Sequence, residues 1–424
     1  MNMLTHIRSL ATGLLGALLL AGVFSACDRK DSEPFVPMEY VTFSGELFTK
    51  NLRLKEVVDE TQGQLHVGAL EPILSGQGLS ESEIKSIMQK VNMYIQLSGE
   101  CYAHAITYHT TGPKGEPIVA SGMIYYPKSG RPKGVIEIVP WIKSKKECGT
   151  ENYAFMPEII PGMSAYVHIV ADQVGYGATA DVPIAYLQYD NVAVVAADMR
   201  RAAEEFVYNR HHCKLSAESI LMGYSLGGGG ALSLAQYYQG HPERGVKVKD
   251  LFIGGGVYDP SLMVKEIFAS GHAGYAQIPS VICSFDHYDD LQIDFGKVFK
   301  GDLLEHYKDW CYGQYNLTEL TEFLGTDLRG YFTDEFLGRE ESEEYRKLLE
   351  ICRQKKISLE QKPDFKIHLS HARKDELVPT SCSDWLYEEL SAMGAEVEYN
   401  KYDANHLTCS LFTFWELWMA LGSR

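Results

Sequence analysis

The stretch ILMGYSLGGGG, residues 220–230, decides the fold of this chain. Its first half is an apolar run typical of a buried strand, and its glycine-rich second half leads into a helical pattern. The centre of the stretch has the pattern Gly-x-Ser-x-Gly of a nucleophile elbow, formed by Gly223, Tyr224, Ser225, Leu226 and Gly227. Glycines let the strand and helix backbones approach closely, while strained dihedrals lift the serine hydroxyl clear of the sheet. The stretch therefore predicts a strand, a tight turn with a nucleophilic serine, and a helix.

A glycine-rich turn of this kind can also bind phosphate. That alternative is disfavoured because the Gly-Lys-Ser/Thr sequence of a phosphate loop is missing and residues 220–230 contain no Lys or Arg. The serine also begins a helix, where the backbone N–H of Leu226 can face a developing oxyanion. The nucleophile interpretation is therefore preferred.

Strand and helix patterns alternate on both sides of this turn. Two alternating runs, 102–110 and 117–127, flank a turn-rich connection and predict a hairpin. Further strand-like runs lie at 134–141, 165–172, 218–225 and 248–259, and helical patterns lie at 191–210 and 229–240. This order predicts an α/β fold with a mainly parallel sheet and helices on both faces. Such sheets place their functional sites at the carboxyl ends of the strands.

Composition narrows the function classes. The chain has 424 residues, of which 45% are hydrophobic and 22% charged, so it is long enough for a large globular core. The formal net charge of −17 argues against binding nucleic acid or anionic lipid through bulk charge. A small neutral or cationic substrate remains compatible with the composition.

The first residues are expected to direct export. A positive flank at Arg8, an apolar stretch and small residues before Cys27 resemble a bacterial lipoprotein signal, with residues 1–26 removed and Cys27 lipidated. Residues 27–37 are then a flexible tether, and the protein is expected in the cell envelope, anchored to a membrane. An ordinary cleaved secretory signal is the alternative.

No cofactor or metal is expected. The remaining eight cysteines show no Cys-x-x-Cys spacing, and no histidine cluster completes a zinc pattern. The acidic segment 285–295 lacks the glycine and spacing of a calcium loop, so a solvated turn is expected there. Disulfides are compatible with export, but the sequence selects no pairing.

A nucleophilic serine needs a base and an acid that orients that base. In this fold they follow the serine in the order acid, then histidine. Asp375 lies just after a strand-like run at 365–370, and His406 follows another strand-like run and precedes the closing helix. We therefore expect Ser225, Asp375 and His406 to meet at the carboxyl ends of their strands.

Other residues offer alternatives to these partners. Asp384 or Asp403 could supply the acid in place of Asp375. We expect three other histidines to be structural or to face solvent: His211, His212 and His371.

With these motifs the chain resembles the α/β-hydrolases, and within them the secretory-lipase-like esterases. The similarity is carried by ITYHTTGPKGEPIVASGMIYYP, VADQVGYGAT, GYSLGG, HARKDELVP and NHLT. It implies a Ser225, Asp375, His406 triad and hydrolysis of esters or lipids. The chain departs from the family at residues 139–149, where His-Gly is common, and at Asn405, where Gly is usual. Because Pro140 has no N–H, the second oxyanion donor is expected at Trp141 or Ile142.

The similarity also predicts the domain organisation. Residues 38–259 and 363–424 form the two parts of the α/β-hydrolase domain, and 260–362 form a helical cap inserted after the sixth strand. The cap would cover Ser225 and shape the substrate pocket. A carboxylesterase or lipase that works through an acyl-enzyme is the preferred function. The alternatives are a serine peptidase of the same fold and a non-catalytic, lipid-anchored module that binds glycan or lipid.

Overall fold

A computed structural model describes residues 35–53, 99–151 and 165–422, together with isolated positions between 56 and 89. One nine-stranded sheet runs through it in the order β1-β2-β3-β5-β4-β6-β7-β8-β9. The strands are β1 Phe43–Arg53, β2 Glu100–Thr111, β3 Pro117–Pro127, β4 Val135–Val139, β5 Val167–Ala171, β6 Glu218–Tyr224, β7 Lys247–Gly254, β8 Lys366–Ala372 and β9 Val397–Tyr402.

The sheet has an antiparallel part and a parallel part. β1, β2, β3 and β5 pair antiparallel, whereas β5, β4, β6, β7, β8 and β9 pair parallel. The predicted hairpin is confirmed, because Tyr102 pairs with Tyr126 and Thr110 with Ile118. The edge strand β1 was not anticipated, because its mostly exposed or half-buried residues carry little apolar signal.

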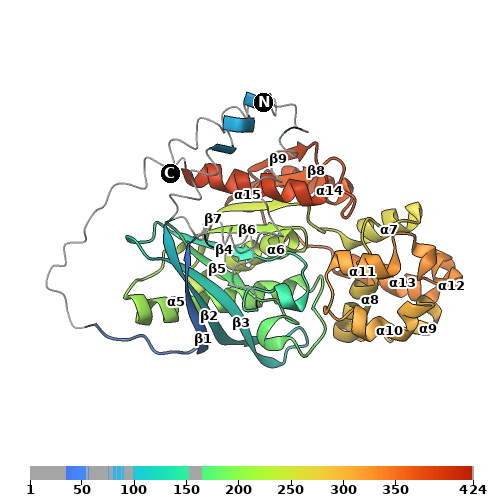
Figure 1. The fold of residues 1–424 in the computed structure, drawn as a ribbon, viewed down its shortest axis with the longest axis horizontal. Helices are drawn as coiled ribbons and strands as arrows, with labels where there is room; N and C mark the ends of the chain where they lie inside the picture. The colour runs from blue at the N-terminus through green and yellow to red at the C-terminus, as the bar shows by residue number, and fades with distance from the viewer. Residues whose placement is uncertain are drawn as a thin grey trace.

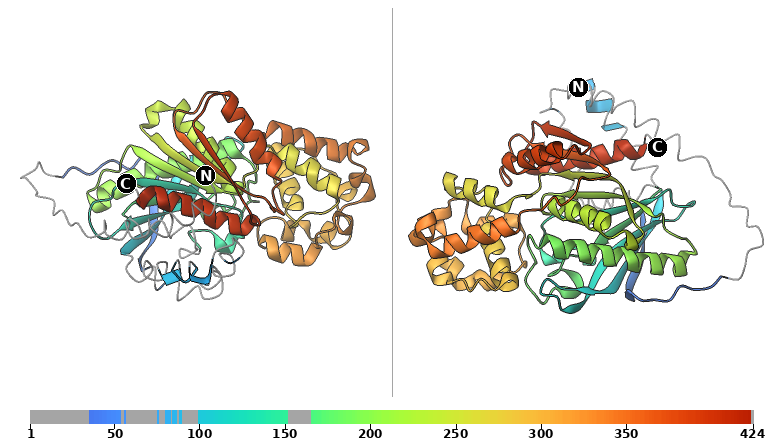
Figure 2. Two further views of the ribbon diagram at one scale, coloured as in Figure 1. Left: turned by 90° about the horizontal axis from the view of Figure 1, so that it is seen from above. Right: turned by 180° about the vertical axis from the view of Figure 1, so that it is seen from behind.

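Helices cover both faces of the sheet, as predicted (Figures 1 and 2). The long helices are α5 Tyr189–His211, α6 Leu226–Gly240, α14 Thr380–Ala392 and α15 His406–Gly422. On β4, Val135 and Val139 belong to the core cluster that includes residues of α5, α6 and α14. Ile136 and Ile138 point the other way, into a cluster with Phe414 of α15. Successive side chains of a strand alternate between faces, so one buried strand supports helices on both.

A group of helices lies between β7 and β8 and gathers at one end of the sheet (Figures 1 and 2). They are α7 Pro260–Ser270, α8 Ile278–Asp289, α9 Phe295–Val298, α10 Asp302–Trp310, α11 Leu317–Leu324, α12 Asp334–Leu337 and α13 Glu343–Gln354. These seven helices and the segments between them, residues 260–354, are called the cap. β7 is the strand expected from the sequence to be the sixth, and the additional β1 makes it the seventh in chain order.

The cap has an aromatic core of its own. The rings of Phe268, Phe332, Phe336 and Tyr345 lie 5.0–5.9 Å apart in contacting pairs. The solvated turn expected at 285–295 is wrong in its first half, which forms the end of α8. Phe285 and Tyr288 of this segment are buried, and burying their apolar surface favours the helix over an exposed turn.

Part of the predicted organisation lies outside the described residues, including the signal at 1–26 and the lipidation site Cys27. At the end of the predicted tether, the ring of Phe35 lies 5.3 Å from that of Tyr208 on α5. In the described part of the chain, every helix is too short or too polar to cross a membrane.

Candidate active site

The turn between β6 and α6 holds Ser225 in a conformation that few side chains adopt. Its φ of 56° and ψ of −126° lie outside the helical and strand regions. Its N–H donates to the carbonyl oxygen of Gly254 at 2.8 Å, which ties the turn to β7. A Cβ at Gly223 would lie 1.9 Å from the oxygen of Gly227, and one at Gly227 would lie 2.1 Å from that of Val139. Only glycine fits these two positions.

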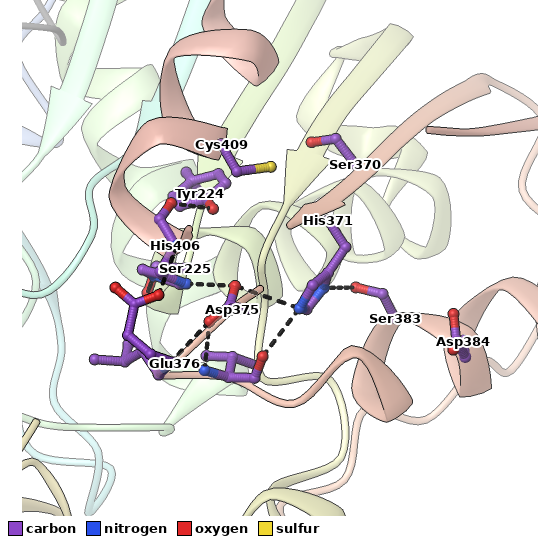
Figure 3. A network of polar contacts seen from close by, with 12 residues as sticks. Tyr224, Ser225, Ser370, His371, Asp375, Glu376, Ser383, Asp384, His406 and Cys409 are labelled. Carbon is purple, nitrogen blue, oxygen red and sulfur yellow. Dashed lines mark hydrogen bonds and ion pairs between the residues drawn. The ribbon is translucent and has the colours of Figure 1, made fainter. Parts of the chain in front are cut away.

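Ser225, His406 and Asp375 are brought together from three strand ends (Figure 3). The Ser225 Oγ lies 2.9 Å from His406 Nε2, and His406 Nδ1 lies 2.7 Å from Asp375 Oδ2. The acid and the histidine are separated by 31 residues in sequence, and the serine and the histidine by 181. Both ring nitrogens of His406 are therefore engaged, one by the hydroxyl and one by the carboxyl.

The loop after β8 fixes the carboxyl group of Asp375. Its Oδ1 accepts hydrogen bonds from the N–H groups of Leu377 at 3.0 Å and Val378 at 2.8 Å. Burial favours the neutral acid, but the hydrogen bond and charge of His406, with help from His371 and the Val378 amide, hold the pKa of Asp375 below its usual value. The acid is therefore ionised at neutral pH and faces the imidazole.

Two contacts that the sequence did not reveal hold His406 at the start of α15. Its N–H donates to Glu376 Oε2 at 3.0 Å, and its carbonyl oxygen accepts from the Tyr224 hydroxyl at 2.6 Å. Tyr224 precedes the serine and Glu376 follows the acid, so each neighbour in the chain also positions the histidine. Their places beside Ser225 and Asp375 are the only sequence signal for these contacts.

The two alternative acids lie in other interactions. Asp384 on α14 accepts from the Tyr399 hydroxyl at 2.7 Å and pairs with Lys401 at 2.6 Å. Asp403 pairs with Lys374 at 2.8 Å, with both side chains exposed. The structure therefore places Asp375, and neither alternative, against the imidazole of His406.

The three remaining histidines of the sequence analysis have different surroundings. His211 lies 2.9 Å from His104 between Nε2 atoms, and His212, at the end of α5, is exposed. His371 is fully buried and contacts Asp375, with 3.3 Å between its Nε2 and Oδ2.

Two of the three expected oxyanion residues, Leu226 and Ile142, line the cavity at the serine. Leu226 is the first residue of α6, and the first N–H groups of a helix have no partner within it. Ile142 lines the same cavity as Ser225 and Leu226. The ring of Trp141 packs edge-on against Phe414, with 6.0 Å between centroids.

A small apolar cavity of about 40 Å³ adjoins Ser225. The sheet domain and the cap both contribute to its walls. The lining residues are Ile142, Tyr186, Leu187, Ser225, Leu226, Val257, Met263, Gln277, Val281, Leu317, Leu377 and Val378. Ser225, Leu226 and Ile142 were expected at the site from the sequence. The other lining residues were not, because they come from loops and helices distant in the chain.

No metal centre is built from the described residues, since they contain no suitable group of three or more His, Cys, Asp or Glu side chains. In the described part of the chain, the eight cysteines from Cys101 to Cys409 form no disulfide. Burial raises the pKa of the Cys409 thiol, which lies near Tyr224, to about 12. This thiol therefore stays protonated at neutral pH.

No family model and no curated protein matches the chain. Solved structures do match it. One is the rice cell wall degrading esterase LipA from Xanthomonas oryzae, with 17% identity over 89% of this chain and 96% of that one, at a TM-score of 0.67. Another is Candida antarctica lipase A, with 16% identity over 74% and 75% of the two chains, at a TM-score of 0.57. The predicted α/β-hydrolase fold is thereby confirmed.

Proposed function

We propose that this protein is a serine hydrolase that cleaves carboxylic esters through an acyl-enzyme intermediate. The observation that carries the proposal is the continuous hydrogen-bonded series from Ser225 Oγ through His406 to the ionised Asp375. The LipA esterase and the lipase that share its fold support ester chemistry at a general level.

The geometry suits a two-step acyl transfer. The carboxylate of Asp375 holds the proton of His406 on Nδ1, so Nε2 is free to accept the proton of Ser225. As Oγ attacks the ester carbonyl, the N–H of Leu226 and a second one from Trp141 or Ile142 stabilise the oxyanion. The tetrahedral intermediate collapses, and the leaving alcohol takes the proton from Nε2. Water then releases the acid by the same route.

The cavity points to a short acyl group. Its volume of about 40 Å³ is well below the roughly 150 Å³ of an engineered void that holds benzene. Its lining is almost entirely apolar, with Gln277 as the main polar exception besides Ser225. We therefore expect acetyl and propionyl esters to be better substrates than long-chain esters.

The test combines a covalent probe with a substrate panel. A fluorophosphonate should label the wild type and not Ser225→Ala, and p-nitrophenyl acetate should be hydrolysed faster than the octanoate. Aminoacyl and dipeptidyl amides, tested in parallel, should be poor substrates; preferential amide cleavage would favour the peptidase alternative. A wild type that neither labels nor hydrolyses any ester would favour the non-catalytic binding module.

We further propose that the chain is an exported lipoprotein anchored through Cys27. The charged flank, apolar stretch and small residues before this cysteine support the proposal. Metabolic labelling with a fatty acid should mark the wild type and leave Cys27→Ala unmarked. Labelling of both chains would contradict it.

A further inference from the structure

A second histidine lies behind the acid of the site. His371, at the end of β8, is 0% exposed and approaches Asp375 from the side opposite His406 (Figure 3). Its Nε2 lies 3.0 Å from the carbonyl oxygen of Val378 and 3.3 Å from Asp375 Oδ2. Its Nδ1 lies 2.6 Å from the hydroxyl of Ser383 on α14.

These partners select one tautomer of His371. Its Nε2 faces two oxygens that only accept hydrogen bonds, so this nitrogen carries the proton and donates to both. The other nitrogen then accepts from the Ser383 hydroxyl. Burial lowers the pKa of His371, against the opposing charge of Asp375, which keeps the ring neutral. The ring can therefore stabilise the carboxylate without adding a positive charge.

The carboxyl of Asp375 thus meets four donors. Two backbone N–H groups hold Oδ1, while His406 and His371 both reach Oδ2. Asp384 also acts on His371, and its carboxylate is itself paired with Lys401. Without His371, Oδ2 would lose the one side-chain donor that does not take part in proton transfer.

We propose that His371, fixed by Ser383, is a positioning residue that holds Asp375 Oδ2 in line with His406. The inference rests on the proposed esterase function, because it assigns His371 to the orientation of the same base. His371 acts through Asp375 and has no contact with the serine in this role. The imidazole of His406 is then oriented by two residues in series.

The test compares His371→Leu with His371→Gln. Leucine removes the donor, so kcat should fall about ten-fold, as for loss of a hydrogen bond to a charged group, with KM little changed. The acidic limb of the pH profile should move to higher pH, because a carboxylate with one donor fewer attracts the proton of the His406 imidazole more strongly. Glutamine can place an N–H near the former Nε2 and should restore most of kcat and the original limb.

Two further variants keep the test decisive. Ser383→Ala frees the His371 ring and should shift the limb in the same direction by a smaller amount, even if His371→Leu fails to fold. His368→Gln changes a histidine of the same strand that stacks on Phe252, 4.2 Å between centroids, and should leave the profile unchanged. Fluorophosphonate titration of active sites corrects kcat for misfolded protein.

Proton NMR separates failure of this inference from failure of the proposed function. The low-field resonance of the proton between His406 Nδ1 and Asp375 should move in His371→Leu and return in His371→Gln, whether or not the chain hydrolyses esters. An unmoved resonance together with an unchanged pH profile per active site would overturn the positioning role. If the wild type has no esterase activity but the resonance still moves in His371→Leu, only the proposed function is overturned.

Discussion

The carboxyl ends of the parallel strands and the cap contribute to one cavity but are stabilised differently. The N–H of Ser225 donates to the carbonyl oxygen of Gly254. The carboxyl group of Asp375 accepts from the N–H groups of Leu377 and Val378. The cap helices pack on one another through aromatic rings such as Phe268 and Phe336. Backbone hydrogen bonds are directional, whereas apolar packing is not. We therefore expect the strand ends to set the chemistry and the cap to set which acyl groups fit the cavity.

Removing the serine hydroxyl should have the largest effect. Ser225→Ala is expected to lower kcat by about 10⁴-fold or more while the protein stays folded, because the nucleophile is lost. The steady-state rate of p-nitrophenyl acetate hydrolysis checks this. Ser233→Ala, in the middle of α6, is the matched control and should retain wild-type kcat. Substantial activity in Ser225→Ala would break the assignment of chemistry to this turn.

Adding a methyl group at the crowded serine turn should have the second-largest effect. In Gly227→Ala the new Cβ would lie 2.1 Å from the carbonyl oxygen of Val139, so strand and helix must separate. We expect a loss of about 3 kcal/mol in the free energy of unfolding, along with most of the activity. Gly240→Ala, at the other end of α6, meets nothing within 4 Å and should be neutral. Urea unfolding of both variants tests the contrast.

The third prediction concerns the pH dependence of stability through α15, the helix that begins with His406. Glu416 is half-buried as a residue, but its Oε2 is enclosed and has no hydrogen-bond partner among the described residues. Burial raises the pKa of Glu416 from an ordinary 4.5 to about 7, although Tyr402 and Asn400 donate to Oε1. The folded state therefore binds this proton more tightly than the unfolded state does.

The stabilisation from that proton is complete below about pH 4.5 and is lost as the pH rises through 7. Glu416→Gln stays neutral, so relative to wild type it should gain about 2 to 3 kcal/mol between pH 4.5 and 8. Urea unfolding across this range measures the gain. Glu388→Gln, at an exposed position of α14, is the matched control. A pH-independent difference for Glu416→Gln would contradict the buried titration.

The smallest effect is expected on the cap side. Leu317→Ala enlarges the cavity from α11 without touching the strand ends. The ratio of kcat/KM for butyrate over acetate should rise about ten-fold, a typical effect of one or two methylenes in a pocket, while kcat for acetate stays near wild type. Leu304→Ala, on the exposed side of α10, should change neither value. A large loss of acetate activity in Leu317→Ala would show that the cap also takes part in the chemistry.

Local sequence predicted much of the sheet domain. The apolar runs at 134–141, 165–172, 218–225 and 248–259 form parallel strands, because burial on both faces demands continuous apolar sequence. The turn at Ser225 was recognisable because only glycine fits at Gly223 and Gly227. β1 could not be predicted, because its exposed side chains give no apolar alternation and the strand is held by hydrogen bonds to β2.

The sequence by itself determined the type of fold, the serine turn and two residues expected to serve it, because each follows from spacing along a few neighbouring positions. Only the tertiary structure decided that Asp375 lies against His406 while Asp384 lies against Lys401. It also placed His371 behind the acid and Leu317 in the cavity wall. These contacts join segments far apart in the chain, and the packing of the whole sheet and cap sets the distances between them.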